Sequence, residues 1–152
     1  MAETIDIQEV TNCTCLKARR AARHLSRLYD TALQPAGVTA NQLGLLAKLF
    51  GARLRGRTGL SVGALADLVG MHPSTLSRDI KPLADQGLVS DAPDPKDGRV
   101  RIVAITKKGQ TKLREAIPAW RRAQAHVQDT LGYEVMLSLN ALLDVTSTKL
   151  TK

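Results

Sequence analysis

The sequence predicts a mainly α-helical fold with one small β-hairpin, in a chain of 152 residues. Hydrophobic residues make up 43% of the chain but aromatic residues only 3%, so the core is aliphatic. Such a composition favours packed helices over a β-sandwich or a barrel. Apolar residues also recur at intervals of three and four along most of the chain, which is the period of an amphipathic helix. A chain of this length forms one compact domain with helical extensions, so a two-domain cofactor enzyme is not expected.

An N-terminal helix is predicted over residues 13–33. Thr11 and Asn12 precede it as capping residues, and Pro35 follows its end. Small and apolar residues mark one face of this segment, and basic residues mark the other. The helix therefore offers an apolar surface on which another helix can pack.

A second helix begins at Thr39, where the Thr39 hydroxyl and the Gln42 side chain predict a capping box. Its expected buried stripe consists of Leu43, Leu46, Ala47 and Phe50. Arg53, Arg55 and Arg57 follow in a glycine-containing loop. Three arginines this close together do not pack in a core, so we expect them to lie either in solvent or against phosphates.

Two further helices, joined by a short turn, come next. Ser61 caps the first of them, and Gly70 ends it in a position suited to a left-handed backbone. Pro73 stands at the first position of the following helix, which Gly87 closes. Pro82 lies inside this helix, where it predicts a kink or a loosened last turn.

A β-hairpin with a long tip is predicted after these helices. Residues 88–90 and 100–105 are short β-compatible runs, and residues 91–99 between them are rich in Asp, Pro and Gly. Thr106 then caps a long helix whose apolar residues are spaced four and three apart, the spacing of a seam against another helix. Gly132 separates that helix from a last, apolar one.

The net charge of +8 is concentrated in the middle of the chain. Residues 1–38 and 113–152 each carry a net charge of +1, whereas residues 39–112 carry 12 basic and 6 acidic side chains, a net +6. A folded and strongly basic segment favours a polyanionic partner, most commonly nucleic acid. We therefore expect a nucleic-acid-binding unit in the middle of the chain and association helices in the two flanks.

The order of helix, short turn, helix and two-stranded hairpin is that of a winged helix-turn-helix, a fold that binds double-stranded DNA. A recognition helix needs an apolar side that docks on its scaffold and a polar, basic side that reaches base edges and phosphates. Leu76, Ile80 and Leu83 form the apolar side. The candidate DNA contacts on the opposite side are Ser74, Thr75, Ser77, Arg78 and Lys81.

The hairpin tip supplies a second group of candidate DNA contacts. Asp97 and Gly98 permit a tight turn, and Arg99 carries a long, permanently charged guanidinium that fits the narrow minor groove. The candidate residues of this wing are Lys96, Asp97, Gly98, Arg99 and Arg101. Lys107 and Lys108 are expected beside the adjacent DNA backbone.

Five short segments carry a distinctive pattern of residues: Leu60–Gly70, Ser74–Arg78, Leu83–Val89, Asp94–Arg99 and Ile105–Gly109. Together they resemble the MarR family of bacterial transcription regulators, and the resemblance covers roughly residues 13–150. Lys96 departs from the family pattern, which has arginine at this position. A lysine makes no bidentate contact, so that contact is not expected here.

The resemblance implies an obligate homodimer, interlocked through its first, fifth and sixth helices, that binds a pseudopalindromic operator. It also implies release by a small-molecule effector or by an oxidant, and repression is the habit of the family. In the family a ligand pocket lies where the winged unit meets the dimerisation helices. In this chain that junction involves the first two helices and the start of the fifth.

A homodimer is also expected from the sequence itself. The terminal helices carry apolar stripes outside a DNA-binding unit that has its own core, so those stripes would be exposed in a monomer. We expect dimerisation helices in residues 1–38 and 113–152, around a winged unit in residues 39–112. The interface would bury about 2,000 Å² or more, and the two recognition helices would lie about 34 Å apart, one turn of duplex.

Cys13 and Cys15 are the two cysteines of the chain, and they are too close together for a disulfide between them to hold the fold together. A helix N-terminus and the nearby Lys17, Arg19 and Arg20 lower the pKa of a thiol, so one of the two can be a redox sensor. Residues two apart on a helix point to nearly opposite sides, however, so an intrachain disulfide would require unwinding. Two interpretations therefore remain: the thiols have no sensing role, or one of them senses oxidants.

Other functional classes fit the sequence less well. The chain has no glycine-rich phosphate loop, no HExxH motif and no nucleophile elbow, so an enzyme is not expected. His24, His72 and His126 lack the spacing of a zinc site, and neither a metal nor a cofactor is expected. No run of about 18 apolar residues occurs, and the acidic N-terminus lacks the apolar core of an export signal. We therefore expect a cytoplasmic protein with no membrane partner.

Two alternatives to a sequence-specific regulator remain. One is a basic winged-helix protein that organises DNA without reading its sequence, and the other is a winged module that docks other proteins. The ratio of operator affinity to random-DNA affinity at fixed salt distinguishes a sequence-specific regulator from these alternatives, because phosphate contacts alone give almost no sequence preference.

Trp120 and Met136 are expected in the core or in an interface and not in a ligand site.

Overall fold

The structure is a computed structural model that describes residues 6–151. In chain order its elements are α1 (Ile7–Thr11), α2 (Thr14–Leu33), the 3-10 helix η1 (Gln34–Ala36), α3 (Ala40–Leu54), β1 (Leu60–Ser61), α4 (Val62–Val69), α5 (Pro73–Asp85), β2 (Val89–Pro93), β3 (Arg101–Ile105), α6 (Lys107–Leu131) and α7 (Tyr133–Leu150). The first five residues of the expected region 1–38 and the last residue of region 113–152 lie outside the described residues.

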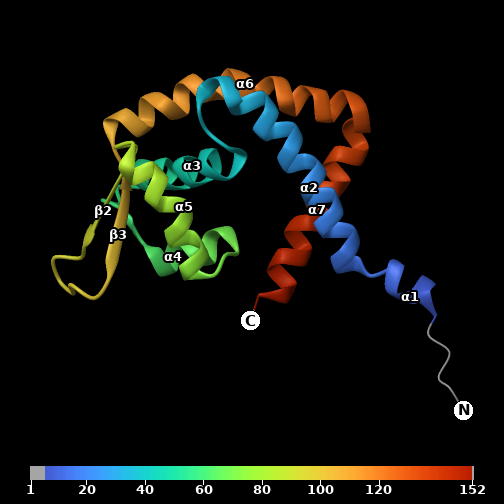
Figure 1. Cartoon of the computed structure of the whole chain (residues 1–152), viewed down its shortest axis with the longest axis horizontal. Helices are drawn as coiled ribbons and strands as arrows, with labels where there is room; N and C mark the ends of the chain where they lie inside the picture. Colours follow the sequence, from blue (N-terminus) through green and yellow to red (C-terminus); the bar gives the residue numbers. More distant parts are fainter. Residues whose placement is uncertain (1–5, 152) are drawn as a thin grey trace, which may run out of the picture.

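The molecule has two lobes connected by α6 (Figure 1). The winged lobe, which consists of α3, α4, α5 and the three strands, lies under the N-terminal half of α6. The second lobe consists of α1, α2, α7 and the C-terminal half of α6. From that end of α6, α7 leads back down, and α2 runs from beside α6 to α1 at the N-terminal end of the chain. The mainly helical fold with a small β-wing and long terminal helices therefore agrees with the fold class that the sequence predicts.

The start of α2 differs from the prediction. Cys13 is the N-cap residue of α2, with φ −56° and ψ 124°, and its side chain makes no capping hydrogen bond. Thr11 and Asn12, the predicted caps, belong to the end of α1, as its last residue and its C-cap. We did not predict α1, because a helix of five residues is too short to show an apolar period.

The capping box at the start of α3 is present. The Gln42 backbone N–H donates to Thr39 Oγ1 at 3.2 Å, and the Thr39 N–H donates to Gln42 Oε1 at 3.0 Å. The buried stripe differs from the prediction, because Ala47 is exposed and Phe50 is only half-buried. The residues of α3 that are buried are Leu43, Leu45, Leu46, Leu49 and Ala52. This face is wider than one stripe because α3 packs against both α6 and β3.

The helix-turn-helix forms where the sequence predicts it. The Ser61 hydroxyl accepts from the backbone N–H of Ala64 at the start of α4, and Gly70 ends that helix with φ +66°. Pro73 is the first residue of α5, which continues as an α-helix through Pro82. A single missing N–H close to the helix end therefore does not interrupt α5.

The wing belongs to a three-stranded antiparallel sheet of order β1-β3-β2. Strand β1 was not predicted, because two residues show no alternation, yet Leu60 pairs with Val103 of β3. Strand β2 extends to Pro93, which pairs with Arg101. Residues 91–93, which we expected in the tip, are therefore part of the paired hairpin.

The core is aliphatic, as the composition predicts, and no polar or charged residue among residues 6–151 is buried. Leu33, Leu65, Leu76 and Leu83 all have an exposed fraction of 0%. The start of α6 meets this core at Gly109, where an added Cβ would collide with the carbonyl oxygen of Leu88. Only glycine fits at that crossing of α6 over the chain before β2.

Helix α6 belongs to both lobes. Leu113, Ala116 and Ala119 of α6 join the core of the winged lobe, whereas Ala123 and Val127 are buried beyond it. The boundary expected between residues 112 and 113 lies within α6, so the winged unit and the C-terminal region share this helix.

Apolar side chains remain exposed over much of the second lobe. The exposed large apolar residues there are Ile7, Val10, Leu16, Leu131, Tyr133, Val135, Leu137, Leu142, Leu143, Val145 and Leu150. Helix α7 buries a single residue, Met136, against the described chain. Within residues 6–151, no helix has both the length and the apolar character to cross a lipid bilayer.

Candidate nucleic-acid interface

Helix α5 has one buried and one exposed face. Leu76, Ile80 and Leu83 are at most 2% exposed and attach the helix to the core. The candidate residues that lie exposed on the outer side are Ser74, Thr75, Ser77, Arg78 and Lys81. All five are therefore accessible on a single helix, with Ser74, Ser77, Arg78 and Lys81 on one face and Thr75 beside it.

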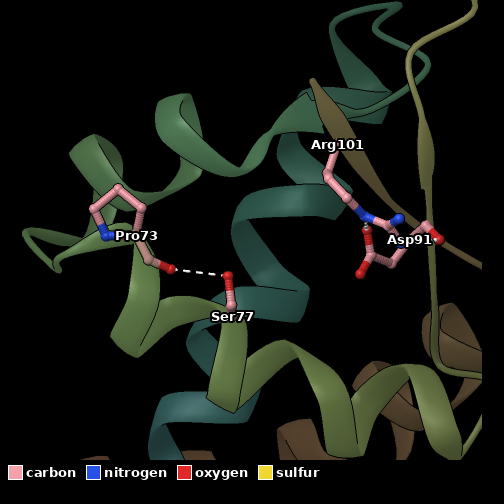
Figure 2. A network of polar contacts seen from close by, with 4 residues as sticks. All are labelled: Pro73, Ser77, Asp91 and Arg101. Atoms are coloured by element: carbon pink, nitrogen blue, oxygen red, sulfur yellow. Dashed lines mark hydrogen bonds and ion pairs between the residues drawn. The ribbon is translucent and has the colours of Figure 1, made fainter. Parts of the chain in front are cut away.

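Side-chain hydrogen bonds organise the start of α5. His72 is the N-cap residue, and its Nδ1 accepts from the backbone N–H of Ser74 at 3.3 Å. The Ser74 hydroxyl lies 2.8 Å from the same ring nitrogen. Figure 2 shows the Ser77 hydroxyl donating to the carbonyl oxygen of Pro73 at 2.9 Å. The Ser77 hydrogen is therefore engaged within the helix, while its oxygen can still accept a hydrogen bond.

The two cations of α5 differ in their surroundings. Lys81 Nζ forms an exposed ion pair with Asp85, at 3.0 Å, one turn further along the helix. Arg78 makes no ion pair within residues 6–151. Exposed pairs of the Lys81 type contribute little stability, so either cation is available to a stronger anion such as a phosphate.

The wing tip is held by backbone hydrogen bonds to two aspartates. Asp97 Oδ1 accepts from the N–H of Arg99 at 3.1 Å, and the Asp97 carbonyl accepts from the N–H of Val100 at 2.9 Å. Asp94 Oδ1 accepts from the N–H of Lys96 at 2.8 Å. Asp97 begins the tight turn that the sequence predicts, but the turn closes at Val100, so Arg99 lies within it beside Gly98 and not after it. The side chains of Lys96 and Arg99 are exposed.

Arg101 is engaged within the hairpin. Its Nε lies 2.8 Å from Asp91 Oδ1, and its Nη2 donates to the Asp91 carbonyl oxygen at 2.9 Å (Figure 2). The hydrogen bond with Asp91, and then the carboxylate charge, raise the pKa of Arg101 above its ordinary value. Arg101 therefore braces the two strands in the free protein, a contact that could not be predicted without the strand register.

Other basic residues surround these two elements. Lys107 is exposed at the start of α6, and Lys108 Nζ donates to the Gln86 carbonyl oxygen at 2.7 Å. Arg53, Arg55 and Arg57 are all exposed. Only Arg57 lies in the expected loop, because Arg53 belongs to the last turn of α3 and Arg55 is its C-cap residue. The chain there is fixed by helix-ending hydrogen bonds, including one of 3.1 Å from the Arg57 N–H to the carbonyl of Ala52.

An apolar cleft of about 430 Å³ lies between α2, α3 and α6. It is lined by Tyr29, Ala40, Leu43, Gly44, Ala47, Leu113, Ile117 and Trp120. None of these residues is charged. Trp120, which we expected in the core or in an interface, is 36% exposed at this cleft. Three elements distant in sequence form the cleft, so its residues could not be named from the sequence.

Tyr29 connects this cleft to α6 and α7. Its hydroxyl donates to Gln124 Oε1 at 2.5 Å, and Gln124 Nε2 donates to the Met136 sulfur at 3.1 Å. Burial raises the pKa of the Tyr29 phenol above its ordinary value, so the hydroxyl stays protonated and can donate.

Both cysteines are exposed at the junction of α1 and α2. Cys15 lies in the first turn of α2, whereas Cys13 precedes the helix with a non-helical ψ of 124°. The expectation that both side chains project from one helix is therefore wrong, and the geometric objection to a Cys13–Cys15 disulfide is weaker than expected. No group of three or more metal-ligating side chains occurs among the described residues.

Comparison with known proteins places this geometry in a family. Residues 41–91 match a family model described as a helix-turn-helix domain. An HTH-type transcriptional regulator of Mycobacterium tuberculosis is 33% identical over 104 residues, which span 68% of this chain and 66% of that protein. The M. tuberculosis transcriptional regulator MosR is 31% identical, and its crystal structure matches 90% of this chain and 97% of its own with a TM-score of 0.74. This chain belongs to the MarR family of winged helix-turn-helix transcriptional regulators.

MarR-family structures include complexes with DNA. MosR has been solved with DNA and is 30% identical to this chain in that structure, with a TM-score of 0.74. A mutant of Escherichia coli MarR complexed with operator DNA is 19% identical and shares the fold, with a TM-score of 0.77 over 93% of this chain and 99% of that one. Membership of the MarR family, whose members are transcriptional regulators, agrees with the expectation that this chain is not an enzyme.

Proposed function

We propose that this MarR-family protein is a cytoplasmic, sequence-specific regulator that binds a pseudopalindromic site in double-stranded DNA as a homodimer. The observation that carries this proposal is the exposed face of α5, which gathers short hydroxyl and basic side chains. The wing projects from the same lobe (Figure 1). The net charge of +6 over residues 39–112 supports the same partner.

On this proposal, α5 enters the major groove. Arg78 reaches base edges, because a guanidinium can bond two acceptors of a guanine at once. Ser74, Thr75 and Ser77 are short enough for their oxygens to meet base amino groups. Lys81 contacts a phosphate and positions the helix.

The wing takes the neighbouring minor groove. Asp97 and Gly98 shape the tip, and the Arg99 side chain that follows them inserts where the negative potential is strongest. Lys96 contributes a point charge to the phosphates on one side of the tip. Arg101 acts mainly through Asp91, by holding the hairpin in shape.

The second lobe provides the dimer interface. Apolar side chains on α1, α2, α6 and α7 lie exposed in the single chain, and water contact with so much apolar surface is unfavourable. A second copy covers them, with residues 1–38 and 113–152 contributing the interface and residues 39–112 the DNA contacts. Repression follows if the operator overlaps a promoter.

The apolar cleft is the site of a releasing effector. Its uncharged lining fits a small, uncharged apolar or aromatic molecule. Such a ligand lowers DNA affinity only if it binds better to the dimer whose recognition helices are wrongly spaced. The cleft touches α2, α3 and α6, so a ligand there can change the angle between the two lobes.

An oxidant is a second route to release, and the non-helical Cys13 favours it. Peroxide oxidises one thiolate to a sulfenic acid and is reduced to water, and the other thiol then displaces water to form the disulfide. We predict that peroxide weakens operator binding of the wild-type protein, and that Cys13→Ser and Cys15→Ser each abolish this response. Electrophoretic mobility shift with and without peroxide measures it, and unchanged wild-type binding in peroxide would leave only the ligand route.

Selection of bound sequences from random duplex DNA tests the proposed function. The expected result is an inverted repeat with half-sites about one helical turn apart. Binding without any enriched sequence, at equal affinity for all duplexes, would instead indicate a protein that organises DNA. No DNA binding at low salt would indicate a protein-docking module.

A further inference from the structure

Two hydrogen bonds connect α2, α3 and α5 in series. Asp30 Oδ1 on α2 accepts from the backbone N–H of Ala40, the first residue of α3, at 2.7 Å. One residue further along α3, Asn41 Nδ2 donates to Asp79 Oδ2 on α5 at 2.7 Å. Asp30 and Asp79 are both half-buried. A terminal helix and the recognition helix thus hold neighbouring residues at the start of one scaffold helix.

The bond from Ala40 to Asp30 fixes the start of α3 to α2. The first N–H groups of a helix have no partner within the helix, and a carboxylate is favoured there by the helix dipole. The capping box between Thr39 and Gln42 satisfies other groups of the same turn. A short, charge-assisted bond to Asp30 therefore makes the N-terminus of α3 follow any movement of α2.

The bond from Asn41 governs the orientation of α5. Asp79 lies between Arg78 and Ile80, at the border of the exposed and the buried face. Asn41 holds this carboxylate against α3, which limits rotation of α5 about its axis.

Asp30 also adjoins the residue that connects α2 to the cleft. Tyr29 lines the apolar cleft and donates to Gln124 on α6, while the next residue holds α3. Consecutive residues of α2 therefore bond to the lobe that we assign to dimerisation and to the scaffold of the recognition helix. A shift of α2 at the cleft is passed directly to the start of α3.

We infer that Asp30, Asn41 and Asp79 are positioning residues that transmit the orientation of α2 to the recognition helix and so set operator discrimination. The inference rests on the proposed function, because it requires that α5 reads DNA. It assigns no DNA contact to Asn41, which acts through Asp79.

The test compares affinities for the selected operator and for random duplex at one salt concentration. Asn41→Ala is expected to lower the operator-to-random ratio about fivefold, the effect of losing one hydrogen bond. Random-DNA affinity and its salt dependence stay at the wild-type values, because no phosphate contact is lost. Asp79→Asn retains the ratio, since an amide oxygen still accepts from Asn41. Gln86→Ala, an exposed amide at the end of α5, is the matched control and leaves the ratio unchanged.

Asp30→Ala tests whether the two bonds act as one linkage. It removes the oxygen that accepts from the Ala40 N–H, so it is expected to lower the same ratio. In the Asn41→Ala background it has no further effect, because groups in one linkage are not additive. Fully additive losses would overturn the linkage.

The outcomes separate the inference from the proposed function. If Asn41→Ala lowers the melting temperature but leaves the operator-to-random ratio unchanged, Asn41 stabilises the fold without positioning α5 for DNA. That result would overturn the inference alone. A wild-type protein with no preferred sequence would overturn the proposed function and the inference together.

Discussion

At the scale of single residues, the arginines of the wing differ in what holds their guanidinium groups. Arg101 bonds twice to Asp91, whereas Arg99 makes no ion pair among residues 6–151. An arginine that already has a partner gains less from a phosphate, because it must first give up the bonds that it has. Of these two arginines, Arg99 is therefore the one whose guanidinium is available to DNA.

Alanine substitutions distinguish these two arginines. We expect Arg99→Ala to weaken operator binding about tenfold or more, through loss of a minor-groove contact. Arg101→Ala is the matched control, and a loss of about threefold at most is expected from it, because its main contact is internal. Fluorescence anisotropy at fixed salt measures both. Equal losses would mean that Arg101 leaves Asp91 to bind DNA.

The two cations of α5 are predicted to differ in kind. Arg78→Ala should relax sequence preference, at a cost of about 1–3 kcal/mol on the preferred site. Lys81→Ala should weaken binding to all duplexes alike and reduce the slope of log affinity against log salt by about one. Binding isotherms at several salt concentrations, on operator and random DNA, measure the difference. The same change in both variants would contradict these assignments.

At the scale of elements, local chemistry explains what the sequence could predict. Thr39, Ser61 and Pro73 start helices through bonds or dihedral preferences that involve only neighbouring residues. The sequence therefore predicts the caps of α3 and α4 and the first residue of α5, but not the cap of α5, which is His72. Strand β1 depends on Val103, more than forty residues away, and α1 is too short for a period. The exposed face of α5 followed from helical periodicity, whereas the Arg101–Asp91 pair and the apolar cleft depend on tertiary contacts.

The crossing of α6 over the chain before β2 gives a prediction about stability. Gly109→Ala is expected to destabilise the fold by about 2 kcal/mol or more, because the new Cβ meets the backbone of Leu88. Gly63→Ala in α4 is the matched control, since nothing lies within 4 Å of its Cβ position. The control should stabilise the protein by up to about 1 kcal/mol, through higher helix propensity. Urea unfolding measures both, and equal stabilities of the two variants would contradict this packing.

At the scale of the whole molecule, the two lobes differ in how complete they are. The winged lobe has a closed aliphatic core, whereas α7 buries only Met136 and leaves Leu142 and Val145 more than half exposed. A protein that exposes this much apolar surface on one lobe favours association with a second copy.

A charge placed on that surface tests the dimer. Leu142→Asp is expected to shift the protein to monomers at micromolar concentration and to weaken operator binding, because desolvating a carboxylate in an interface is unfavourable. Leu54→Asp in the winged lobe, at a residue that is 71% exposed, is the matched control and should remain dimeric. Sedimentation velocity measures both. A monomeric wild-type protein would end the dimer proposal.

Helix α6 is continuous through both lobes, so its length and its helical phase set the distance and the rotation between them. Each residue of an α-helix adds a rise of about 1.5 Å and a turn of about 100°. An insertion or deletion between Ala119 and Ala123, where burial passes from one lobe to the other, would therefore both displace and swivel one lobe against the other. The number of residues in this stretch would then set the length and phase of the DNA sites that two copies can span. We expect natural relatives with differently spaced half-sites to differ in this stretch more than in α5.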